Sequence, residues 1–143
     1  MIESMVSSLK AICDLVSQDT ITARAVAAAL GEVSGGEQVG VPFTVRPKDP
    51  IMSAIRVVRD GDSDMLSHVD LTPIQPIPMT ALVATFGAPH EVPRATNPKR
   101  LPRVSFSVIQ PGRSHTATIF ASYEEGTHEA ADGLVMQLMI RRD

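Results

Sequence analysis

Aromatic residues are scarce in this chain. Phenylalanine, tyrosine and tryptophan make up 3% of the 143 residues, with no tryptophan and a single tyrosine. Because stacking on aromatic rings carries much of single-stranded nucleic-acid binding, this scarcity argues against such a role. It also leaves few aromatic anchors for a protein interface. The core must therefore be built from aliphatic residues and the seven methionines.

Cysteine and long hydrophobic runs are lacking as well. The single cysteine, Cys13, cannot form an internal disulfide, so nothing indicates an oxidising compartment. No run approaches the roughly 20 apolar residues of a membrane span. Residues 1–8 show neither the basic nor the apolar region of a secretory signal. We therefore expect a soluble, cytoplasmic protein of bacterial type that does not associate with a membrane.

Excess charge and catalytic motifs are also missing. The formal net charge is −3, which gives no general reason to expect nucleic acid as a partner. The chain contains no phosphate-binding loop, dinucleotide glycine pattern, nucleophile elbow, zinc-protease motif or paired cysteine ligands. The glycine-rich stretch Ser34-Gly35-Gly36 leads into Glu37 and Gln38, which would not cradle a phosphate. We expect no cofactor, no metal and no catalysis.

What is present begins with helix signals. Residues 2–17 place apolar side chains at the spacing of one helix face, with Cys13 in the middle as a small buried hydrophobe. A second helix is predicted to start at Thr22 and to end at Gly31. A third, residues 79–86, ends before Gly87 and Pro89.

Alternating patterns predict strands after each of the last two helices. In the first half they are residues 41–46, 51–59 and 65–71; in the second half they are residues 104–108, 116–123 and 134–140. Residues 72–78 contain three prolines and are predicted to be a joint, not a central strand or a helix. The order α-α-β-β-β, then α-β-β-β, predicts an α+β fold with helices packed on one face of an antiparallel sheet.

The repeated order suggests one supersecondary unit used twice. We interpret residues 1–143 as a single compact domain with two sub-units, residues 1–71 and 79–143, joined by residues 72–78. The pattern lies in element order and glycine position, since the two halves share little residue identity.

Part of this pattern resembles a known type of protein. Thr80, the apolar residues after it and Phe86-Gly87-Ala88-Pro89 resemble the helix of the small barrel-assembly lipoproteins, in which a threonine precedes Leu-Gly-x-Pro. The β-lactamase inhibitor proteins share a related helix-pair-on-sheet architecture in tandem. The resemblance covers Thr80 to Pro89, with an echo at Thr22, Leu30 and Gly31. It implies a fold and a binding function, and it carries no functional residue over.

The chain also departs from both families. The lipoproteins have a lipid-modified cysteine after an apolar leader, whereas Cys13 lies in a predicted helix with a polar face. The inhibitors have disulfides and aromatic-rich binding faces, and this chain has neither.

Histidines are the obvious candidates for a ligand or a base. His68 and Asp70 are two residues apart, so on a strand both side chains face the same way, opposite to Val69 and Leu71. With His90 they define an alternative pocket for a small-molecule-binding or enzymatic domain. The competing interpretation is a solvated strand face. His115 and His128 fall in a turn and a polar loop.

The proline-rich loop of residues 88–103 carries the strongest local charge. Arg94, Lys99, Arg100 and Arg103 follow one another with no acidic residue between them. One interpretation is a solvated loop stiffened by proline, and the other is an electrostatic contact with an acidic protein. Because long loops in small domains are often functional, we expect these residues to form the binding surface.

Three hypotheses follow from the sequence. The first is a non-catalytic protein-binding module of the immunity, inhibitor or secretion-chaperone kind. The second is a small-molecule-binding or enzymatic domain with its pocket near His68 and Asp70, between the helices and the sheet. The third is a homodimer in which residues 104–108 or 134–140 pair across a sheet edge.

Overall fold

The computed structural model confirms the α+β class. It describes residues 2–19, 21–36, 38, 41–92, 101–109, 111–113, 115–124 and 133–142. The helices of this part are α1 (Ile2–Val16), α2 (Ala23–Leu30) and α3 (Met79–Phe86). Its strands are β1 (Gly31–Ser34), β2 (Phe43–Pro47), β3 (Met52–Arg59), β4 (Leu66–Pro73), β5 (Ile77–Pro78), β6 (His90–Glu91), β7 (Arg103–Val108), β8 (Ala117–Glu124) and β9 (Leu134–Arg142).

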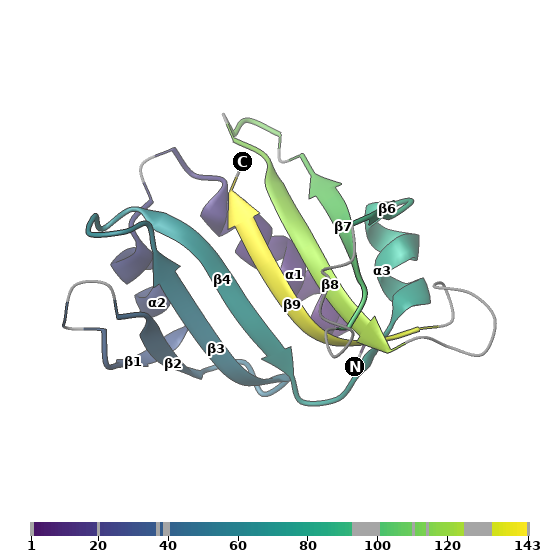
Figure 1. Ribbon diagram of the computed structural model, residues 1–143, viewed down its shortest axis with the longest axis horizontal. Helices are drawn as coiled ribbons and strands as arrows, with labels where there is room; N and C mark the ends of the chain where they lie inside the picture. The colour runs from purple at the N-terminus through teal and green to yellow at the C-terminus, as the bar shows by residue number, and fades with distance from the viewer. Residues whose placement is uncertain are drawn as a thin grey trace.

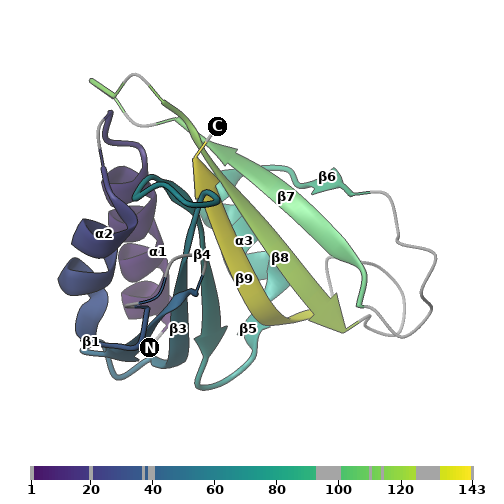
Figure 2. The ribbon, with the colours of Figure 1, turned by 60° about the vertical axis from the view of Figure 1, so that its left-hand side comes forward.

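These strands form one antiparallel sheet. Its order is β1-β2-β3-β4-β9-β8-β7-β6, and β5 pairs with β9 off this path. The three helices lie on the same side of the sheet, and no helix of the described residues covers its other side, which we call the open face (Figures 1 and 2). The sheet twists strongly along its length (Figure 2), which curves the open face.

The two halves of the sheet meet at its centre. In each half an eight-residue helix, α2 or α3, is followed by four strands, and β1–β4 and β6–β9 each pair in consecutive order. The halves join where His68–Leu71 of β4 pair with Leu138–Arg141 of β9. That the halves are one supersecondary unit used twice stays a prediction.

Several expectations about the strands were wrong. Two short strands were not predicted: β1 follows α2, and β6 follows α3. The halves therefore contain more strands than predicted. Residues 72–78 were predicted to take no part in a central strand, but Thr72 and Pro73 end β4, which lies between β3 and β9; β5 occupies Ile77–Pro78. Proline fits there because it stands at strand ends, where the missing N–H leaves few ladder bonds unmade.

The proposed edge pairing of residues 134–140 was also wrong. β9 lies between β4 and β8 and bonds to both, so it offers no edge to a second copy. Residues 104–108 lie in β7, which pairs with β8 on one side and with β6 at Val104 and Ser105 on the other. A homodimer through β7 stays a prediction.

The core fills the space between the helices and the sheet. Alternate strand residues turn toward the helices, and Val57, Val69 and Ile140 are fully buried in three neighbouring strands. From α1, Leu9, Cys13 and Val16 enter the same core with no exposed surface. No helix in the described residues is long and apolar enough to cross a bilayer.

Burial raises the pKa of the Cys13 thiol from 9.0 to about 12, because the core disfavours the thiolate. The folded state therefore holds its proton at a pH where the unfolded state has lost it. This contribution to stability is complete below pH 9 and is lost as pH rises toward 12. At pH 10.5 we expect a cost of about 2 kcal/mol relative to Cys13→Ala, since one pKa unit is worth about 1.4 kcal/mol. Urea unfolding of the wild type and of Cys13→Ala at pH 8 and pH 10.5 measures this difference. If the free energy of unfolding fell equally in the two proteins between these pH values, the prediction would be wrong.

Candidate functional site

The open face of the sheet carries a row of functional side chains. Residues that pair directly across antiparallel strands share a face. The register places the following side chains opposite one another, from β3 to β6: Arg56, Asp70, Met139, Phe120, Ser105 and His90. Most of these side chains remain solvent-accessible, whereas their sequence neighbours Val57, Val69 and Ile119 are buried on the helix side.

A hollow of about 280 Å³ lies in the middle of this face. Small side chains on β3, β4 and β8, including Ala54, Thr72 and Ser122, leave the space, while longer ones surround it. The charged residues that line it are Arg56, Asp70 and Arg103. Phe120, Met139 and Gln137 supply an aromatic, an apolar and an amide surface. The hollow is thus a polar site with an apolar wall.

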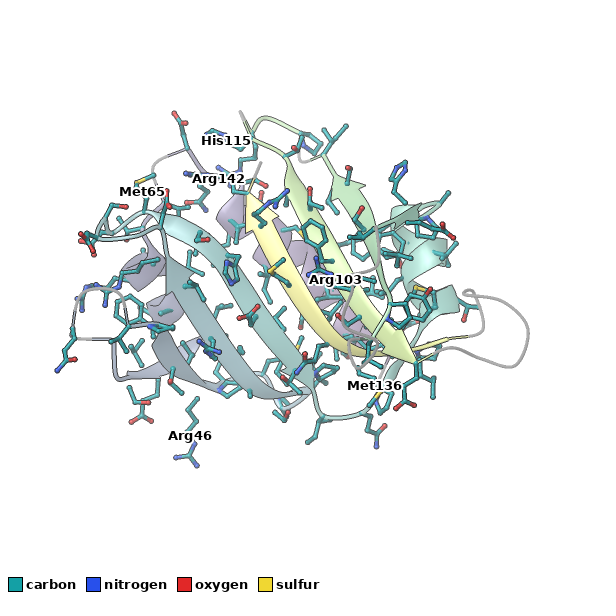
Figure 3. All side chains as sticks on the ribbon, viewed as in Figure 1. Arg46, Met65, Arg103, His115, Met136 and Arg142 are labelled. Carbon is teal, nitrogen blue, oxygen red and sulfur yellow. The ribbon has the colours of Figure 1, made fainter. Side chains whose placement is uncertain are left out.

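Phe120 and two arginines form what we call the arginine–phenylalanine cluster. The guanidinium carbon of Arg103 lies 5.1 Å from the centroid of the Phe120 ring, and that of Arg141 lies 5.0 Å from it. Arg103 belongs to β7 but reaches over the sheet toward its centre (Figure 3). Cation–π contacts at such distances are worth about 0.5–1 kcal/mol when exposed. They hold both cations over the open face.

The predicted site residues are only partly brought together. Asp70 and Arg103, from two separate hypotheses, line the same hollow. His68 is adjacent to it on β4: its Nε2 lies 3.6 Å from Asp70 Oδ2, and its Nδ1 lies 2.9 Å from Ser67 Oγ. Both side chains are partly exposed, as on a solvated strand face.

His90 does not join this group. Four strand pairings separate it from Asp70, which at about 4.8 Å per pairing is roughly 19 Å. Arg94, Lys99 and Arg100 lie outside the described residues, as does His128. His115 lies near α1, where its Nε2 is 2.9 Å from Asp19 Oδ1. The described part of the chain contains no group of three potential metal ligands.

The alternative pocket was placed on the wrong side for His68 and Asp70. On the helix side of the sheet, a cleft of about 330 Å³ lies between α1, α2 and β3. Its lining is mainly apolar, with Ile12, Leu15, Leu30, Met52 and Ile55. Asp70 instead faces the open side, because strand alternation sends Val69 and Leu71 inward.

Arg59 is an unusual residue on the helix side. Its side chain is 7% exposed, and its Nε and Nη2 are buried without a hydrogen-bond partner in the described structure. Its guanidinium stacks over Phe43 at 4.3 Å, while Nη1 lies 3.9 Å from Asp64 Oδ1, a weak contact. Each unpaired buried donor costs about 1–3 kcal/mol.

Arg59→Met should therefore stabilise the protein, although it removes the cation–π contact. A methionine keeps apolar contact with Phe43 and removes both unpaired donors, so we expect the free energy of unfolding to rise by about 1 kcal/mol. Arg56→Met, on the open face, is the control and should stay within about 0.5 kcal/mol of wild type. Urea denaturation tests this. Destabilisation by Arg59→Met would mean that the guanidinium has an acceptor after all.

Comparison with known proteins identifies no relative. No protein-family model matches the chain. No curated protein is found to match it, and no solved structure matches its fold. The resemblance at Thr80–Pro89 therefore stays an interpretation, and function must be argued from the geometry of this chain.

Proposed function

We propose that this chain is a non-catalytic protein-binding module and that the open sheet face is its contact surface. The observation that carries the proposal is the arginine–phenylalanine cluster beside the hollow. Arginine is enriched among the residues that dominate protein–protein affinity, and phenylalanine is enriched in protein interfaces. Met139 adds an adaptable apolar surface to the same face. A cytoplasmic location and an immunity, inhibitor or secretion-chaperone role belong to this proposal.

Charge reversal on this face should abolish binding. For the double variant Arg103→Glu/Arg141→Glu we expect affinity for the partner to fall at least about 100-fold, because truncating such anchors costs about 2 kcal/mol or more and reversal adds repulsion. Lys10→Glu/Lys48→Glu makes the same change in charge on the helix side of the sheet, since Lys10 is exposed on α1 and Lys48 lines the cleft between α1, α2 and β3. The control should bind as wild type does in a quantitative pull-down.

Photo-crosslinking locates the contact independently. A benzophenone amino acid at Ser105, beside Phe120 on the open face, should crosslink to the partner. The same group at Ala84, exposed on α3, should not. Crosslinks from Ala84 alone would place the contact on the helix side and refute the proposal.

The cleft between α1 and α2 favours a second candidate, a small-molecule-binding domain. Its volume and apolar lining are those of ordinary ligand pockets, which hold about 300–1,000 Å³. Leu15→Trp and Ala29→Trp would fill it. If a ligand found by thermal-shift screening loses its effect in both variants, the cleft is its site.

A further inference from the structure

The cleft between α1, α2 and β3 presents apolar surface beside the core. The residues of α1 that line it and recur at the spacing of one helix face are Ser8, Ala11, Ile12 and Leu15. Ala29 and Leu30 line it from α2, which lies beside α1 on the helix side of the sheet (Figure 2). Leu15 and Leu30 are only half-buried, because the alanines near them are too short to cover them. A ligand would therefore meet uncovered aliphatic side chains in this cleft.

The dimensions of the cleft suit an aliphatic chain. Ser8 and Leu15 are seven residues apart on α1, which is about 10 Å at 1.5 Å per residue. The volume of the cleft is about 330 Å³. Since an apolar cavity of about 150 Å³ holds one benzene molecule, the cleft has room for roughly twice as many carbons. An elongated molecule of about ten carbons fits this length and volume.

The charges that line the cleft oppose one another. The carboxylate of Asp14 accepts hydrogen bonds from Arg113 Nε and Nη2 at 3.0 and 3.1 Å, so an ion pair compensates it. Lys48 and Asp49 are adjacent in the chain and both line the cleft, so their charges offset each other. Asp49 also accepts a hydrogen bond from the hydroxyl of Ser8, which places this opposed pair at the Ser8 end of the cleft. Each charged residue of the described lining thus has an opposite charge beside it.

We infer that the cleft binds an uncharged molecule with an elongated aliphatic body of about ten carbons. The aliphatic body packs on Leu15, Leu30 and Met52, and the polar end lies beside Lys48 and Asp49. A hydroxyl there can accept a hydrogen bond from the ammonium and donate one to the carboxylate. This inference rests on the candidate small-molecule function and adds the class of the ligand to it.

The opposed charges argue against an ionic ligand. A carboxylate at this end would be attracted by Lys48 and repelled by Asp49, and an ammonium group would meet the reverse. Either ion would lose part of its hydration on entering the cleft and gain little net attraction in return. An uncharged end avoids this loss, so the charge pattern selects for it.

The test compares three molecules that share one chain and differ at its end: 1-octanol, octanoate and octylamine. An NMR titration at pH 7, where the last two are charged, follows the methyl signals of Leu15 and Leu30. We expect saturable shifts with octanol and at least about tenfold weaker binding of either ion. Asp49→Asn should strengthen octanoate binding about threefold and Lys48→Gln should do so for octylamine, the scale of an exposed ion pair. Octanol binding should change little in both variants.

Two replacements of alanine by tryptophan locate the binding. Ala29→Trp fills the cleft and should abolish the shifts with octanol. Ala54→Trp is the matched control in the hollow of the open face, and it should leave the affinity for octanol within about twofold of wild type. If Ala29→Trp does not fold, Leu15→Trp fills the same cleft, and the methyl signals of Leu30 report on it.

Octanoate or octylamine that bound as tightly as octanol would overturn the inference, as would octanol shifts that survive filling of the cleft. An ion that binds best, and is lost in Ala29→Trp, would leave the cleft as a small-molecule site and only the ligand class wrong. No shift with any of the three would overturn the inference and the small-molecule candidate together. The crosslink from Ser105 tests the protein-binding proposal separately, because it reports on the open face.

Discussion

Phe106→Ala should cost about 3–5 kcal/mol of folding free energy, as large aromatic truncations in a core do. Phe106 is 1% exposed on β7, and its ring lies 6.2 Å from that of Phe86 on α3. The substitution removes the ring contact between β7 and α3. Because single domains are stable by only about 5–15 kcal/mol, the variant could approach unfolding at room temperature. Urea denaturation measures the loss.

Two variants make this prediction specific. Phe106→Leu keeps most of the volume and should cost less than about 1.5 kcal/mol, so it gives a measurable value even if the alanine variant does not fold. Phe120→Ala removes the same ring from the opposite face of the neighbouring strand. It should cost about 1 kcal/mol of stability while weakening partner binding, because Phe120 is only half-buried. Equal stability losses at Phe106 and Phe120 would contradict the division into a core face and a contact face.

Gly31→Ala should be the other strongly destabilising change. A methyl group at Gly31 would lie 2.0 Å from the carbonyl oxygen of Arg46 and 3.1 Å from the backbone nitrogen of Lys48. Both atoms belong to the backbone, one at Arg46 within β2 and the other at Lys48 directly after it. The overlap is therefore relieved only by separating β1 from β2. We expect a loss of about 3 kcal/mol, at the upper end for overpacked sites.

The reason is close approach and not backbone torsion. Gly31 has φ 162°, an extended value that any residue adopts, whereas Gly87 at the end of α3 has φ 90° and no atom near its missing side chain. Ser34→Ala, at the other end of β1, is the control and should change stability by less than about 0.5 kcal/mol. Thermal or urea unfolding checks both. A near-neutral Gly31→Ala would mean that the pairing of β1 with β2 yields easily.

The elements that carry strong local signals could be predicted from the sequence. The helix at residues 79–86 was placed correctly, because Gly87 and Pro89 end it and nothing else in that stretch competes. The alternation of Val104, Phe106 and Val108 likewise located β7. The short strands β1 and β6 could not be predicted, since their few residues become strands only by pairing with β2 and β7.

The site was harder to predict than the fold. Asp70 and Arg103 are far apart in the sequence, and only the pairing of β4 with β9 brings their strands into one sheet. Arg56, Phe120 and Arg141 were missed. A signal for Phe120 was present: it alternates with Ala117, Ile119 and Ala121, which assigns it to the polar face of its strand. A half-buried aromatic residue at such a position indicates a contact surface.

The central place of β9 affects how the chain is made. A ribosome synthesises β1–β4 first, and β4 then presents an unpaired edge until β9 emerges after every other strand of the sheet. During that interval β4 and β8 can each pair with strands of another nascent chain. The first half is thus exposed to aggregation while residues 74–133 are synthesised, and the second half only after β8 is complete at Glu124. A nascent chain cut short before Leu134 would keep both edges exposed permanently.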